Sequence, residues 1–142
     1  MDVAIDSSAW VCSLLPEPEA GQYERALTRA VGGRMSALSV LETRLVLSTK
    51  GGAPVLDAFE RLLERLRIQV VAFDAAAALQ AFAAHRRFGK GRHPAGLNMG
   101  DCASYALAKA LDLPLLFKGD DFARTDVTPA LPLLLAEAGG AA

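Results

Sequence analysis

Short apolar runs alternate along the chain with longer stretches whose apolar positions recur every three or four residues. The short runs predict buried strands over residues 3–5, 34–38, 68–73 and 114–117. The longer stretches predict helices over residues 9–15, 20–30, 39–50, 55–67, 74–88 and 101–111. Alternating strands and helices are typical of a parallel sheet covered on both faces, so the pattern predicts an α/β fold.

The predicted elements follow one another without an internal repeat or a linker. We therefore assign residues 1–135 to a single domain and residues 136–142 to a frayed C-terminal tail. A chain of 142 residues suits one hydrophobic core. With 52% hydrophobic and 22% charged residues, the composition excludes an intrinsically disordered protein.

The charges are nearly balanced, with 15 Lys and Arg against 16 Asp and Glu. Contact with nucleic-acid phosphates would therefore depend on a local basic patch or a bound metal ion. Two cysteines, Cys12 and Cys102, make a disulfide framework implausible. No targeting segment or membrane span is recognisable, so we expect a cytoplasmic protein without membrane association.

Acidic residues stand where parallel sheets bind ligands. Asp6 follows the first predicted strand, Asp120 and Asp121 follow the last, and Glu42 and Asp101 lie in the first turns of predicted helices. Strand ends and the helix starts that follow them face the same edge of such a sheet. We therefore expect these carboxylates to converge.

Taken singly, each of these acids also has a structural explanation. Ser39 and Glu42 match a capping box, Asp101 suits a helix N-terminus, and the remaining acids suit turns. Taken together, four converging carboxylates would repel one another unless a cation balanced them. Carboxylates without clustered Cys or His are typical ligands of Mg²⁺ or Mn²⁺. The residues alone leave both explanations open.

Motifs that contain these acids resemble those of the PIN-domain ribonucleases, most closely the VapC-type toxins of bacterial toxin–antitoxin pairs. The motifs are IDSSA at 5–9, LET at 41–43, FGKGRH at 88–93, AGLNMGDC at 95–102, LLFKGDDF at 115–122 and TD at 125–126. The resemblance implies a PIN-like three-layer α/β/α fold with a mostly parallel sheet of four to five strands. It also implies an endoribonuclease that depends on Mg²⁺ or Mn²⁺ and that leaves a 5′-phosphate and a 3′-hydroxyl.

The resemblance also implies roles for the acids. Asp6, Glu42 and Asp101 match the family's three central acids, with Asp6 and Asp101 as metal ligands. Glu42 would ligate a second ion or orient water. The fourth acid would be Asp121, which precedes a phenylalanine and would hold ligands or waters around the ion, with Asp120 as the alternative. The family further implies a homodimer and a small antitoxin that covers the acidic site, often with an arginine.

Residues 85–93 contain four of the fifteen Lys and Arg residues. The candidate RNA or phosphate contacts are Ser8, Arg86, Arg87, Lys90, Arg92 and Lys118. A solvated helix end whose cations favour the carbonyl dipole explains the basic stretch equally well, and a helix cap explains Ser8 equally well. For His93, which has no second histidine at ligand spacing, we expect a loop or RNA contact instead of a metal bond.

Three other functions suit a similar sheet. A phosphoacceptor signalling domain needs adjacent acids after the first strand, and a phosphatase with an aspartate nucleophile wants a second aspartate two residues on. Here Asp6 is followed by Ser7 and Ser8. A degenerate PIN domain that only binds a partner is disfavoured because every expected acid is present.

Overall fold

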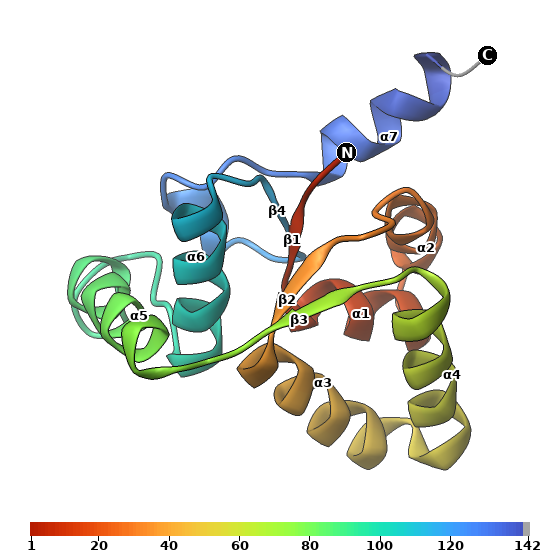
Figure 1. Ribbon diagram of the computed structural model, residues 1–142, viewed down its shortest axis with the longest axis horizontal. Coiled ribbons are helices and arrows are strands. Elements are labelled where there is room, and N and C mark those ends of the chain that lie inside the picture. Colours follow the sequence, from red (N-terminus) through yellow and green to blue (C-terminus); the bar gives the residue numbers. More distant parts are fainter. Residues whose placement is uncertain (141–142) are drawn as a thin grey trace.

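The computed structural model describes the backbone of residues 1–140 and the side chains through residue 136. Figure 1 shows a central sheet with helices on both sides. The strands are β1 (Ala4–Ile5), β2 (Arg34–Ser36), β3 (Gln69–Val71) and β4 (Leu115–Leu116). The helices are α1 (Ser7–Leu14), α2 (Ala20–Thr28), α3 (Ala37–Lys50), α4 (Gly52–Arg65), α5 (Ala75–Phe88), α6 (Met99–Leu111) and α7 (Leu131–Gly140), with a 3₁₀ turn, η1 (Phe122–Arg124).

The sheet has the order β3-β2-β1-β4, and each pair of neighbouring strands is parallel. The chain builds outwards from β1 through β2 to β3, and it then returns past β1 to add β4 on the other side. The direction of strand addition therefore reverses between β1 and β4. In parallel sheets ligands bind at such a reversal, outside the carboxyl ends of the strands.

Two hydrophobic clusters cover the two faces of the sheet. Because side chains alternate along a strand, Val3 and Ile5 face one cluster and Ala4 faces the other. The first cluster packs α1 to α4 and α7 on the sheet, and its centre holds Trp10 and Phe59 in an edge-to-face contact, with 5.1 Å between ring centroids. The second packs α5 and α6 on the opposite face. The expected three-layer α/β/α fold is confirmed, with four parallel strands in the described part of the chain.

The helices α1, α3, α4 and α6 begin two or three residues before their predicted starts, and capping side chains explain the starts of α3 and α6. α3 begins at Ala37 because the Ser36 side chain accepts a hydrogen bond from Leu38 N, whereas the spacing predicted a start at Ser39. α6 begins at Met99, two residues before the predicted start, because Asn98 caps it. Capping side chains fix both starts more closely than apolar spacing does.

The C-terminal helix α7 begins at Leu131 and extends through Gly140, into the segment 136–142 that the sequence predicts as a tail. Residues 141 and 142 lie outside the described residues. Over residues 1–140, none of the helices combines the length and the apolar character that crossing a membrane requires.

Candidate active site

Asp6 lies directly after β1, at the carboxyl end of the strand, and is only 2% exposed. Its Oδ2 accepts a hydrogen bond from Ser8 N at 3.0 Å, which caps α1. Its Oδ1 accepts from the Ser104 hydroxyl at 2.5 Å. A buried carboxylate is costly unless it is hydrogen-bonded, and these two donors still leave lone pairs on both oxygens.

A chain of buried hydroxyls supports Asp6 from behind. Ser39 and Ser104 lie 3.0 Å apart between their Oγ atoms, and both are buried. Because the single proton of the Ser104 hydroxyl is donated to Asp6, Ser39 donates to Ser104. Sequence analysis missed Ser104, although its spacing of three residues from Asp101 on one helix was a usable signal.

Glu42 lies in the second turn of α3, where it does not cap the helix. Its Oε1 accepts a hydrogen bond from the Ser7 hydroxyl at 2.6 Å. The capping-box interpretation of Ser39 and Glu42 is therefore wrong, since Ser36 takes the capping position and Ser39 is buried inside the helix. On its other side, the Glu42 carboxylate lies against Gly100, where an added Cβ would be 2.4 Å from Oε2.

Asp101 is the third residue of α6 and forms a capping box with Asn98. Asp101 Oδ2 accepts from Asn98 N at 3.1 Å, and Asn98 Oδ1 accepts from Asp101 N at 2.9 Å. Burial raises the pKa of Asp101 to about 7 against the opposing effect of the Asn98 N–H, and the negative charges of Asp6, Asp121 and Glu42 raise it further. Asp101 thus has its expected structural role at the start of α6, and its pKa is also affected by three other carboxylates.

The segment after β4 turns at Gly119, whose φ of +110° favours glycine. Asp120 and Asp121 follow, and both are exposed. Asp121, at the start of η1, is the member of this pair whose charge raises the pKa of Asp101. This electrostatic effect favours Asp121 over Asp120 as the fourth acid of the cluster. Asp6, Glu42, Asp101 and Asp121 are called the acidic cluster below.

The acidic cluster is more open than a closed metal cage. In the part of the chain that the structure describes, no three Asp, Glu, His or Cys side chains come close enough to enclose an ion. Mg²⁺ keeps several of its waters and binds proteins through only one or two carboxylates. Asp6 and Asp101 fit an ion held in that way, because both are carboxylates at the strand reversal and the charge of Asp6 helps to raise the pKa of Asp101, whose largest cause is burial.

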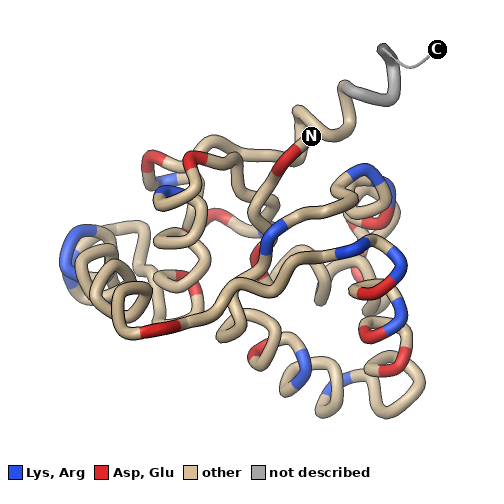
Figure 2. The backbone as a smooth tube through the Cα atoms, in the orientation of Figure 1, with Lys and Arg blue, Asp and Glu red and all other residues tan. Residues whose placement is uncertain are grey.

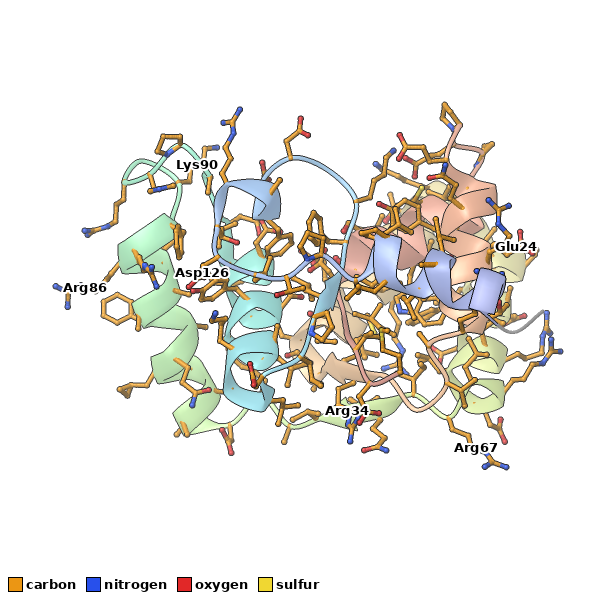
Figure 3. All side chains as sticks on the ribbon, turned by 90° about the horizontal axis from the view of Figure 1, so that it is seen from above. Glu24, Arg34, Arg67, Arg86, Lys90 and Asp126 are labelled. Carbon is orange, nitrogen blue, oxygen red and sulfur yellow. The ribbon has the colours of Figure 1, made fainter. Side chains whose placement is uncertain are left out.

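Basic residues gather at the carboxyl end of α5 and in the loop that follows, as Figure 2 shows. Arg86, Lys90 and Arg92 are exposed, and Arg86 and Lys90 point outwards in Figure 3. Arg87 instead pairs with Asp126, with 3.4 Å from Nη1 to Oδ2. His93 makes a loop contact, as expected, since its Nδ1 accepts from Ala95 N at 3.0 Å.

The side chains of Lys118 and Ser8 both have partners within the protein. The Lys118 ammonium pairs with the Glu17 carboxylate, and Lys118 N donates to Ser8 Oγ at 3.0 Å. Ser8 therefore links the start of α1 to the end of β4, and Asp6 is the residue that caps α1. Both side chains lie near the carboxyl ends of β1 and β4, but neither is free as the structure stands.

Comparison with known proteins defines the class of this fold and site. The sequence model of the PIN domain matches residues 3–127. Ribonuclease VapC30 of Mycobacterium tuberculosis is 47% identical over 131 residues, which is 92% of this chain and all of VapC30. Ribonuclease VapC of Mycolicibacterium smegmatis is 47% identical over 125 residues, covering 88% of this chain and 97% of the relative.

Solved structures share the fold at low sequence identity. The M. tuberculosis toxin VapC20, described as cleaving the sarcin–ricin loop, superposes with a TM-score of 0.72 at 16% identity and covers 89% of this chain and 99% of its own. FitAcB from Neisseria gonorrhoeae gives a TM-score of 0.61 at 21% identity, covering 91% of this chain and 96% of its own.

The chain belongs to the PIN-domain family and, within it, to the VapC-type ribonuclease toxins. It is accordingly the toxin of a toxin–antitoxin pair, with endoribonuclease activity.

Proposed function

We propose that the chain hydrolyses RNA with the help of Mg²⁺ or Mn²⁺ bound at the acidic cluster. The observation that supports this most is that Asp6, Asp121 and Glu42, which come from different parts of the fold, add their charges to the effect of burial and raise the pKa of Asp101 to about 7. Hard divalent cations prefer such oxygen ligands. When bound, the ion lowers the pKa of water and stabilises negative charge on a phosphoryl group.

Each acid has a distinct task in this proposal. Asp6 and Asp101 hold the ion, and Ser104 and Asn98 fix the direction of their carboxylates. Glu42, held by Ser7, orients a water or a second ion. Asp121 is exposed beside Asp101 and holds waters around the ion. Tight control of ligand direction by hydrogen bonds is how proteins commonly tune metal sites.

The exposed cations Arg86, Lys90 and Arg92 suit contacts with RNA phosphates that bring the substrate towards the acidic cluster. Arg87 and Lys118 would first have to leave their carboxylate partners, Asp126 and Glu17. We therefore assign the first contacts to the three exposed residues, and we place the reaction in the cytoplasm, where RNA is present.

The partners in this proposal are a small antitoxin and a second copy of the chain. A carboxylate-lined site suits an antitoxin arginine, which pairs well with carboxylates.

An apolar face formed by Leu41, Leu45, Phe82 and Met99 supports a homodimer, because each of these side chains is at least 51% exposed. Met99 joins two hollows on this face, of about 370 and 190 Å³, and the smaller one is also lined by Glu42 and Gly100.

Cleavage of RNA by the purified protein tests the proposed chemistry. We expect activity with Mg²⁺ or Mn²⁺ that EDTA abolishes, and a loss of about a hundredfold or more in Asp6→Asn. Sequencing of 5′-phosphate ends identifies the cut site. Robust cleavage by Asp6→Asn, or by the wild type in EDTA, would contradict the metal-ligand assignment.

Asp121→Asn and Asp120→Asn form a matched pair within the same turn. Asp121→Asn is expected to lower kcat by about tenfold, whereas Asp120→Asn stays within about twofold of the wild type. The reverse result would assign the fourth acid to Asp120.

A further inference from the structure

The segment from Gly119 to Thr125 places Asp121 at the acidic cluster. The Asp121 side chain itself makes few contacts. Asp121 is exposed, and its side chain makes no capping hydrogen bond to η1. The position of Asp121 therefore depends on what holds the segment, which includes a hydrogen bond from Arg124 Nη1 to Pro94 O at 3.0 Å and the contacts at its two ends. At the near end Phe122 is buried against Phe117, with 5.2 Å between ring centroids. At the far end the segment is held through Asp126.

Asp126 receives donors from two helices, and Figure 3 shows it between α5 and α6. Its Oδ1 accepts a hydrogen bond of 2.5 Å from the Tyr105 hydroxyl. Its Oδ2 lies 3.3 Å from Lys109 Nζ and 3.4 Å from Arg87 Nη1. The hydrogen bond from Tyr105 is the largest cause that lowers the pKa of Asp126, while burial raises the pKa of Tyr105 to about 12. The pair is thus a neutral donor and an ionised acceptor.

Of the three contacts that the Asp126 carboxylate makes, the hydrogen bond from Tyr105 holds it most firmly. Tyr105 is 7% exposed, whereas the side chains of Lys109 and Arg87 are 46% and 63% exposed. Exposed ion pairs contribute little, because solvent screens them and both side chains lose entropy. A short hydrogen bond from a buried hydroxyl to a carboxylate is stronger and more directional.

The spacing of residues on α6 connects this contact to the site. Tyr105 follows Asp101 by four residues, so the two side chains lie on one face of the helix, one turn apart. Phe122, the neighbour of Asp121, lies in the same buried cluster as Cys102, the neighbour of Asp101, and Asp126 contacts Tyr105. The segment after β4 is therefore aligned against α6 at two points. We propose that Tyr105 and Asp126 are positioning residues that set Asp121 opposite Asp101.

This inference rests on the proposed metal-dependent function, and Tyr105→Phe tests it. The substitution keeps the ring, which packs on Phe88 at 5.4 Å between centroids, and it removes only the hydroxyl. We expect about tenfold weaker Mn²⁺ binding without RNA, measured by the electron paramagnetic resonance signal of free Mn²⁺. We also expect kcat on RNA to fall by about tenfold while KM stays within about twofold. Unchanged Mn²⁺ binding together with unchanged kcat would overturn the proposal.

Combining the substitution with Asp121→Asn separates positioning from a general loss of structure. If Tyr105 acts through Asp121, then Tyr105→Phe changes Mn²⁺ binding and kcat by less than about twofold in the Asp121→Asn background. Full additivity of the two substitutions would overturn the proposal.

Lys109→Ala removes an exposed partner of the Asp126 carboxylate, and we expect less than about a twofold effect on Mn²⁺ binding and kcat. A loss as large as that of Tyr105→Phe would overturn the assignment to Tyr105.

Hydrogen exchange distinguishes a failure of this inference from a failure of the proposed function. In metal-free protein, Tyr105→Phe is expected to speed amide exchange in residues 119–125 by about tenfold while exchange in α1 stays unchanged. Unchanged exchange in residues 119–125 would overturn the positioning role. If exchange in residues 119–125 becomes faster but the protein neither binds Mn²⁺ nor needs it for cleavage, the positioning role of Tyr105 is upheld. Only the metal-dependent function is then refuted.

Discussion

Gly100 determines how closely α6 approaches the carboxylate of Glu42. An added Cβ would lie 2.4 Å from Oε2 and 2.7 Å from Oε1, well inside any contact that real Cβ atoms make. Ser7 holds the same carboxylate from the other side at 2.6 Å. A side chain at position 100 would therefore move Glu42 away from its place in the acidic cluster.

Gly100→Ala is expected to lower kcat/KM on RNA by about tenfold or more, because Glu42 has to move. The free energy of unfolding is expected to change by only about 1 kcal/mol, since alanine is favoured over glycine in a helix. Gly21→Ala in α2 is the matched control, because its Cβ would meet Arg25 at an ordinary 3.6 Å. Full activity in Gly100→Ala would show that the position of Glu42 is not needed.

Asp101 gives the metal-free protein a pH-dependent stability. Its pKa is about 7 in the folded state and 3.8 when unperturbed, so the folded state binds the proton more tightly. This contribution to stability is complete below about pH 4 and is lost as the pH rises through 7. In Asp101→Asn, urea unfolding in EDTA is expected to show a smaller decline from pH 5 to pH 8. At pH 8 the variant is expected to be more stable than the wild type by about 1 kcal/mol, after allowing for solvent screening. A parallel decline in both proteins would contradict the raised pKa.

At the scale of the elements, apolar spacing predicts the helices better than it predicts their starts. Asp74 caps α5 as expected, because one acid stands alone before an Ala-rich stretch. Around the start of α3 the chain has Ser36 and Ser39, and both match the capping preference. Tertiary packing decides between them: Ser39 is turned inwards to reach Ser104 on α6. The sequence contains no local signal for that contact across 65 residues.

The hydroxyl chain between α3 and α6 predicts unequal effects of two similar substitutions. Ser104→Ala removes the donor to Oδ1 of the buried Asp6, so we expect a loss of about 1–3 kcal/mol in stability and weaker Mn²⁺ binding. Ser39→Ala keeps that hydrogen bond and is expected to cost about 1 kcal/mol, with metal binding nearly unchanged. Chemical unfolding and Mn²⁺ titration measure both quantities. Equal effects on Mn²⁺ binding would argue against the support of Asp6 by Ser104.

At the scale of the whole molecule, the alternation of elements predicts the parallel sheet, but the strand order comes from the structure. The order β3-β2-β1-β4 brings the ends of β1 and β4 together, and with them Asp6 and the turn that holds Asp121. The acids themselves could be selected from the sequence, because family motifs contain them. Ser104 and Gly100 support Asp6 and Glu42 through contacts whose partners only the fold brings near, whereas Asn98 caps Asp101 locally, three residues away.

The proposed homodimer is also a property of the whole molecule. Phe82→Glu places a charge on the apolar face and is expected to weaken dimerisation by about tenfold or more, measured by sedimentation across a concentration series. Val31→Glu is the control, because Val31 is 52% exposed before β2 and does not line either hollow of that face. A wild type that stays monomeric at all concentrations would contradict the dimer.

The strand order also has a consequence during translation. β1 is made early, yet its neighbour β4 and the turn with Asp121 are made last among the parts of the acidic cluster. Until β4 pairs with β1, a nascent chain has Asp6, Glu42 and Asp101, but Asp121, the fourth acid of the proposed site, is not yet in place. Because such distant pairing is slow to form, the newborn toxin passes through a period in which its site is incomplete. We therefore expect the proposed site to be completed only after β4 has been made.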